Sequence, residues 1–71
     1  MANIYVEYGD GKPAKKVKVT VSVDGGGMAS GFTGNDGWAN IQTSGTRGKI
    51  YVNGREVAQG SLQNRHVIYP R

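Results

Sequence analysis

Apolar and polar residues alternate with a period of two along most of this chain. In the clearest segment, Lys15–Val23, every second residue from position 17 is valine, and lysine, threonine and serine fill the positions between. Such alternation predicts a strand with one buried and one solvated face. No segment free of glycine and β-branched runs has the i, i+3, i+4, i+7 apolar spacing of a helix. The pattern therefore predicts strands.

Seven short strands follow from this alternation and from the turn residues between them. In chain order they are Asn3–Tyr8, Lys15–Val23, Met28–Thr33, Trp38–Thr43, Lys49–Val52, Arg55–Leu62 and His66–Tyr69, with Pro70 ending the last one. Short strands at this regular spacing are typical of a small sandwich or barrel. We expect an all-β domain, a small antiparallel β-sandwich of about seven short strands, with a small open β-barrel as the alternative.

Turn chemistry assigns partners to some of these strands. Gly34-Asn35-Asp36-Gly37 predicts a tight hairpin, because these residues tolerate the positive φ that such turns require. Asn53-Gly54 is the strongest two-residue hairpin signal and predicts a type I′ turn. A further hairpin is expected from Trp38 to Val52, turning through residues 44–48. The apolar positions of three strands then predict a core of Val17, Val19, Val21, Ala39, Ile41, Ile50 and Val52.

Composition agrees with one small β-domain that spans residues 1–71. Valine, isoleucine and threonine total 16 residues, whereas leucine occurs once, and β-branched residues favour strands. A domain of this size buries only about 60% of the surface of its unfolded chain. A second domain and a deep enclosed active-site cleft are both excluded. The absence of cysteine excludes disulfides and thiolate metal sites.

The chain is basic, with a formal net charge of +4 and a pI near 9.7. Such a surface attracts phosphates or acidic partners, but the same charges also solubilise exposed strands. The N-terminus has no basic stretch followed by an apolar run, so no signal peptide is expected, and cytoplasmic localisation is the default. No segment is apolar enough to span a membrane. Edge strands in so small a sheet leave pairing with a second copy open.

No group of residues predicts catalysis or a cofactor. His66 is the only histidine, and its place beside Arg65 on the last strand predicts an exposed strand residue. The five acids fall mostly in turns, without the closely spaced carboxylates of a calcium loop. Gly25-Gly26-Gly27 has no following helix or Lys-Ser pair, so a flexible turn is favoured over a phosphate loop. We expect no enzyme, no cofactor and no metal site.

The aromatic residues carry the functional prediction. If Ala39 and Ile41 face the core, the period of the strand places Trp38 outward, and Tyr5 and Tyr51 lie outward for the same reason. Outward aromatics either cover the ends of the sheets or stack on sugars or bases. Within the expected hairpin from Trp38 to Val52, the outward residues share one surface. The candidate binding face therefore consists of Trp38, Arg47, Lys49 and Tyr51.

Three segments resemble the transthyretin-like β-sandwich modules, which include carboxypeptidase regulatory-like domains and collagen-adhesin B-type repeats. Gly11-Lys12-Pro13 precedes the valine-rich strand, and Thr33–Ile41 matches the family's Thr-(x)n-Asp-x-Gly element before a strand. Gly48–Val52 is similar to the third element, with Ile50 where the family usually has an aromatic residue. The match covers roughly residues 4 to 60 and consists mostly of turn chemistry.

The resemblance implies a non-catalytic stalk, spacer or binding module whose partner is a protein or a carbohydrate. Some adhesin repeats contain a Lys–Asn isopeptide crosslink assisted by a buried acid. Glu7 lies on the wrong strand for that acid, and no asparagine near the C-terminus falls within a clear strand, so the crosslink is not expected here. The alternative is a small basic β-fold that binds single-stranded nucleic acid through Tyr5, Trp38 and Tyr51.

Overall fold

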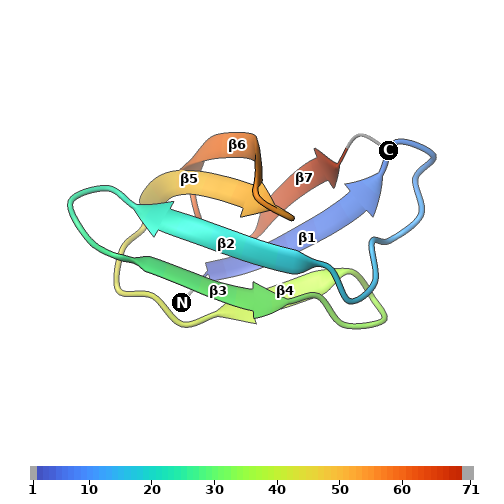
Figure 1. The fold of residues 1–71 in the computed structure, drawn as a ribbon, viewed down its shortest axis with the longest axis horizontal. Coiled ribbons are helices and arrows are strands. Elements are labelled where there is room, and N and C mark those ends of the chain that lie inside the picture. Colours follow the sequence, from blue (N-terminus) through green and yellow to red (C-terminus); the bar gives the residue numbers. More distant parts are fainter. Residues whose placement is uncertain (1, 70–71) are drawn as a thin grey trace.

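The computed structural model describes residues 2–69, and this part of the chain contains seven β-strands and no helix (Figure 1). The strands are β1 (Ala2–Tyr8), β2 (Lys18–Val23), β3 (Met28–Phe32), β4 (Trp38–Ile41), β5 (Arg47–Val52), β6 (Arg55–Ser61) and β7 (Arg65–Tyr69). Their bounds lie close to the predicted ones, except that β2 begins later than expected. The predicted end of the last strand at Pro70 lies outside the described residues.

The strands form two sheets that pack face to face as a sandwich. The three-stranded sheet has the order β4-β1-β7, and the four-stranded sheet has the order β3-β2-β5-β6. All pairs are antiparallel except β1 and β7, which run parallel. Strand β3 also lies beside β4, and β6 beside β7, so the sheets approach each other at both edges. The expected all-β fold is confirmed, and it includes one parallel pair.

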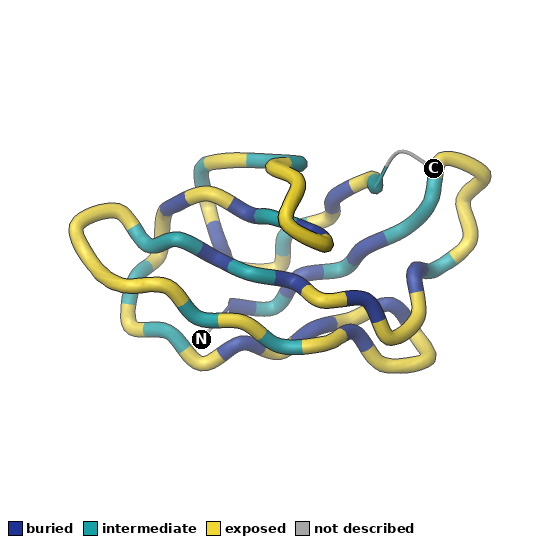
Figure 2. The backbone as a smooth tube through the Cα atoms, viewed as in Figure 1, coloured by how far each residue is buried: buried dark blue, intermediate teal, exposed yellow. Residues whose placement is uncertain are grey.

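One hydrophobic core lies between the two sheets, and the buried positions alternate along the strands that enclose it (Figure 2). Every residue predicted for the core is buried: Val17, Val19, Val21, Ala39, Ile41, Ile50 and Val52. Residues from outside the predicted core set complete it, namely Ala2, Ile4, Val6, Ala14, Leu62 and Val67. Val23, which the alternation also places inward, is only partly buried.

The start of the valine-rich strand was predicted three residues too early. Lys16 has a φ of 54°, which an extended strand does not allow, so the chain turns a corner before β2. Thr33 stabilises this corner. Its buried hydroxyl donates to the Ala14 carbonyl oxygen (2.6 Å) and accepts a hydrogen bond from the Val17 backbone N–H (3.0 Å).

The two predicted tight turns have different outcomes. Asn53 and Gly54 both have positive φ, 52° and 83°, and join the paired strands β5 and β6, which confirms that hairpin. The turn at Gly34–Gly37 also forms, closed by a hydrogen bond from the Gly34 N–H to the Trp38 carbonyl oxygen (2.9 Å). However, it connects β3 to β4, which belong to different sheets. The hairpin predicted there is wrong, because the turn carries the chain from one sheet to the other.

Candidate functional site

The structure separates the four residues expected to share one binding face. Trp38 lies on β4 in the three-stranded sheet, whereas Arg47, Lys49 and Tyr51 lie on β5 in the four-stranded sheet. Strand β4 pairs with β1, and β5 pairs with β2 and β6. The predicted hairpin from Trp38 to Val52 is therefore wrong, because the segment after β4 crosses between the sheets. Trp38 and Tyr51 face outward on opposite sides of the sandwich.

Trp38 instead belongs to an aromatic row (Tyr5, Trp38, His66) that runs across the three-stranded sheet. In the strand register Tyr5 of β1 lies opposite Trp38 of β4 on one side and His66 of β7 on the other. The Tyr5 and Trp38 ring centroids are 5.3 Å apart at an angle of 46°, and His66 makes an edge contact with Tyr5 at 4.9 Å. Trp38 is 38% exposed. The row forms a continuous aromatic surface.

Polar side chains flank the aromatic row on the same sheet. Asn3 and Asn40 lie opposite each other, two residues along their strands from Tyr5 and Trp38. On the other side of the row, Glu7 Oε1 is 2.5 Å from His66 Nε2, and this contact becomes an ion pair when the imidazole is protonated. The alternation of burial along these strands leaves no lysine or arginine at an outward position of β1, β4 or β7. This surface therefore combines ring faces with hydrogen-bonding groups.

The turn at Gly34–Gly37 fixes the geometry of the aromatic row. The Trp38 N–H donates to Asp36 Oδ1 (3.1 Å), and the Val6 N–H donates to the Gly37 carbonyl oxygen (2.9 Å). Gly37 has a φ of +85°, and a Cβ atom there would lie 2.9 Å from both Tyr5 Cε1 and Pro13 Cβ. Only glycine satisfies both the positive φ and the close packing. Gly37 thus allows the Tyr5 ring to lie beside the start of β4.

The outer side of the four-stranded sheet carries a basic face (Lys18, Met28, Phe32, Arg47, Lys49, Tyr51). Phe32 lies opposite Lys18 in the register of β3 and β2, and Met28 lies opposite Ser22, which in turn is opposite Lys49 of β5. Phe32 and Met28 are 67% and 68% exposed. The predicted association of aromatic and cationic side chains therefore occurs on this sheet, without Trp38.

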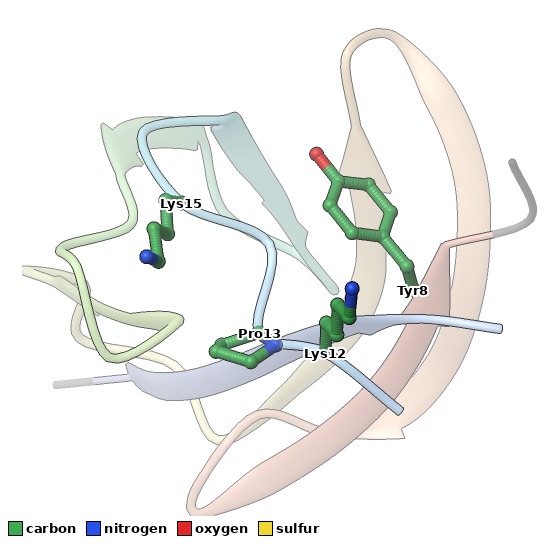
Figure 3. Close-up of a pocket in the computed structure, with 4 residues that line it drawn as sticks. All are labelled: Tyr8, Lys12, Pro13 and Lys15. Atoms are coloured by element: carbon green, nitrogen blue, oxygen red, sulfur yellow. The ribbon is translucent and has the colours of Figure 1, made fainter. Parts of the chain in front are cut away.

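A hollow of about 430 Å³ opens near the end of β1, lined by Tyr8, Lys12, Pro13 and Lys15 (Figure 3). Tyr8 is the last residue of β1 and packs partly against the core, and its ring lies 6.3 Å from that of Tyr69. Figure 3 shows Lys12 beside the Tyr8 ring and Lys15 on the other side of the hollow. Sequence reasoning missed this site, because only the folded connection from β1 to β2 brings Lys15 opposite Tyr8.

Within residues 2–69 no three histidine, aspartate or glutamate side chains gather in the manner of metal ligands. His66 is exposed, as predicted, and among the described residues its ionic contact is with Glu7 alone. In the same range no helix is long and apolar enough to cross a membrane.

Comparisons with protein-family models, curated proteins and solved structures give no match to this chain.

Proposed function

We propose that this chain is a non-catalytic binding module of the transthyretin-like kind that holds a carbohydrate on its aromatic row. The observation that carries the proposal is the contact of Tyr5 and Trp38, whose ring centroids are 5.3 Å apart on the outer side of the three-stranded sheet. A sugar ring has apolar C–H faces and a rim of hydroxyls. Aromatic faces with a few polar groups beside them complement both features.

The groups around the row favour a sugar over a protein partner. Asn3 and Asn40 offer amide donors and acceptors on one side, and Glu7 and His66 offer further polar atoms on the other. The core of a protein interface is depleted in charged residues, whereas the Glu7–His66 pair lies directly beside Tyr5. Strand β7 adds one large aliphatic residue to this side, Ile68, which is 57% exposed.

The resemblance to transthyretin-like modules supports the non-catalytic part of the proposal. Thr33 and Gly37, which belong to the matching Thr-(x)n-Asp-x-Gly element, have structural roles at the corner before β2 and beneath Tyr5. This element therefore serves the framework that positions Trp38. If the aromatic row binds no sugar, we expect the module to act as a spacer without a ligand. Pairing of an edge strand with a second copy of the chain stays a prediction.

Trp38 fluorescence provides the test, because Trp38 is the only tryptophan of the chain. Titration with soluble oligosaccharides of glucose, xylose, N-acetylglucosamine and galacturonate should change its emission for at least one series. Calorimetry should show that the Trp38→Ala variant no longer binds the oligosaccharide. The matched variant Tyr51→Ala, changed on the opposite sheet, should still bind it. Circular dichroism confirms that both variants are folded. Binding by Trp38→Ala at the affinity of the parent would refute the proposal.

Single-stranded nucleic acid is the second candidate, and the basic face favours it. Phe32 and Tyr51 supply rings for base stacking, and Lys18, Arg47 and Lys49 supply cations for phosphates. Binding there should weaken steeply as salt is raised, because counterions are released on association. It should be lost in Phe32→Ala and unchanged in Trp38→Ala, which is the reverse of the result expected for the sugar.

A further inference from the structure

A second hollow, of about 300 Å³, lies on the four-stranded sheet, at the end of the sandwich where β2 ends beside the start of β5 (Figure 1). We call it the β5 hollow. Its lining residues are Asp24, Arg47, Gly48, Lys49, Gln59 and Gly60. Two of them, Arg47 and Lys49, belong to the binding face expected from the sequence, and the proposed sugar site uses neither.

The strand register brings polar side chains of β5 and β6 together at the β5 hollow. Arg47 and Lys49 are two residues apart on β5, so their side chains leave the sheet on the same side, about 7 Å apart. Gln59 of β6 lies opposite Lys49, and Ser61 lies opposite Arg47. The Cβ atoms of directly opposed residues lie about 5 Å apart. Because all four side chains are exposed, they can reach one small ligand from two strands.

The β5 hollow is positively charged. Among residues 2–69 neither Arg47 nor Lys49 forms an ion pair. Asp24 is the acid among the lining residues, and its backbone N–H donates to the Arg47 carbonyl oxygen (3.0 Å), which places it at the Arg47 end. The Lys49 end has no acid among the lining residues, and Gln59 adds an amide donor there. The hollow therefore favours an anion.

We infer that the β5 hollow binds a phosphate group. Arg47 and Lys49 lie on either side of the anion, and the amide of Gln59 donates to a further oxygen. A phosphate offers oxygens to several donors at once and pairs well with a guanidinium, whereas the two oxygens of a carboxylate lie in one plane. The inference is independent of sugar binding by the aromatic row, which lies on the other sheet. It gives the second candidate function a defined phosphate position.

Titration with inorganic phosphate, followed by amide chemical shifts, tests the site, with sodium chloride at equal ionic strength as the reference. The N–H signals of Gly48 and Gly60 should shift with phosphate and stay in place with chloride. Lys49→Ala should weaken phosphate binding about fivefold, the scale of one exposed ion pair. Asp24→Asn should strengthen it, because the substitution removes a carboxylate that repels the anion.

Lys18→Ala is the matched control on the same side of the sheet. Lys18 lies four residues along β2 from Ser22, the strand partner of Lys49. That separation of about 13 Å exceeds the screening length in 0.1 M salt, so the control should bind phosphate as the parent does. Equal losses in Lys18→Ala and Lys49→Ala would overturn the inference, because the attraction would then come from the overall charge. Unmoved glycine amides in the hollow would overturn it as well.

A second titration, with single-stranded oligothymidylate, identifies the source of the phosphate group. If Gly48 and Gly60 shift with this probe and Lys49→Ala weakens its binding, the backbone of a nucleic acid supplies the phosphate. If the two amides shift with inorganic phosphate alone, the ligand is a small phosphorylated molecule. Sugar binding is read from Trp38 emission on the other sheet, so failure of the phosphate site and failure of the proposed function are distinguishable.

Discussion

Single residues with unusual environments hold this small sandwich together. Thr33 is the clearest example, because it is polar, only 3% exposed, and bonded to two backbone groups of the corner before β2. A buried backbone group without a partner costs free energy, so the hydroxyl of Thr33 supplies the partner that the Ala14 carbonyl oxygen and the Val17 N–H need.

Thr33→Val should therefore destabilise the fold by about 1–3 kcal/mol, since valine has the same shape but leaves two buried backbone groups unpaired. Thr20→Val is the matched control, because Thr20 lies on the outer side of β2, where a β-branched apolar residue is tolerated. Urea denaturation followed by circular dichroism measures both. Equal midpoints for the two variants would show that the Thr33 hydroxyl has no such role.

Gly37 can be tested in the same way against Gly54. Both have nearly the same φ, +85° and +83°, but a Cβ on Gly37 would meet Tyr5, Pro13 and Val6, whereas one on Gly54 meets nothing within 4 Å. Gly54→Ala should cost about 1 kcal/mol for the left-handed backbone alone. Gly37→Ala should cost a further 1–3 kcal/mol, roughly the cost of overpacking.

Gly37→Ala should also change the emission of Trp38, because the Tyr5 ring must move to make room for the methyl group. Gly54→Ala, at the far end of β5, should leave that emission unchanged. Equal losses of stability in the two variants, together with unchanged Trp38 emission in both, would show that Gly37 does not position the aromatic row.

At the scale of the strands, local pattern and turn chemistry predict much of the fold. The alternation in β2 and β5 identifies Val19, Val21, Ile50 and Val52 as buried, and the Asn53-Gly54 signal identifies the turn between β5 and β6. These features depend on neighbours in the sequence, namely the two-residue period of side chains and the φ that a turn requires.

Strand pairing could not be predicted in the same way. The alternation of β4 is the same whether it pairs with β5 or with β1, and the Gly34–Gly37 turn suits a hairpin as well as a crossing between sheets. The parallel pairing of β1 with β7 joins the two ends of the described chain, so no local signal reports it. For that reason Tyr5 and Trp38 could each be identified as outward, but not as neighbours.

Val19 and Thr20 are neighbours on β2 whose side chains point to opposite faces of the sheet. Val19 is fully buried, and Thr20 is its outward neighbour. Val19→Asp should unfold the domain, because an unpaired buried carboxylate costs several kcal/mol and a domain of this size has about 3–5 kcal/mol of stability. Thr20→Asp should remain folded. Far-UV circular dichroism and thermal melts compare the two, and a cooperative melt for Val19→Asp near that of the parent would contradict the buried position of β2.

At the scale of the whole molecule, the sandwich presents two outer sides of different chemistry. The outer side of the three-stranded sheet carries the aromatic row with its amides and the Glu7–His66 pair, and the other side carries the basic face. The hairpin predicted from Trp38 to Val52 placed Trp38, Arg47 and Lys49 on one surface. The fold instead separates Trp38 from Arg47 and Lys49, so the aromatic row and the basic face lie on opposite sides of the sandwich.

The most direct test of the central claim is a map of amide chemical shifts during titration with the oligosaccharide that changes Trp38 emission. We predict that the shifts concentrate on outward positions of β1, β4 and β7, around Tyr5, Trp38 and His66. The indole N–H of Trp38 should shift at the same ligand concentration. Shifts concentrated instead around Lys18, Phe32 and Tyr51, with the Trp38 indole unmoved, would contradict the claim that the aromatic row is the binding surface.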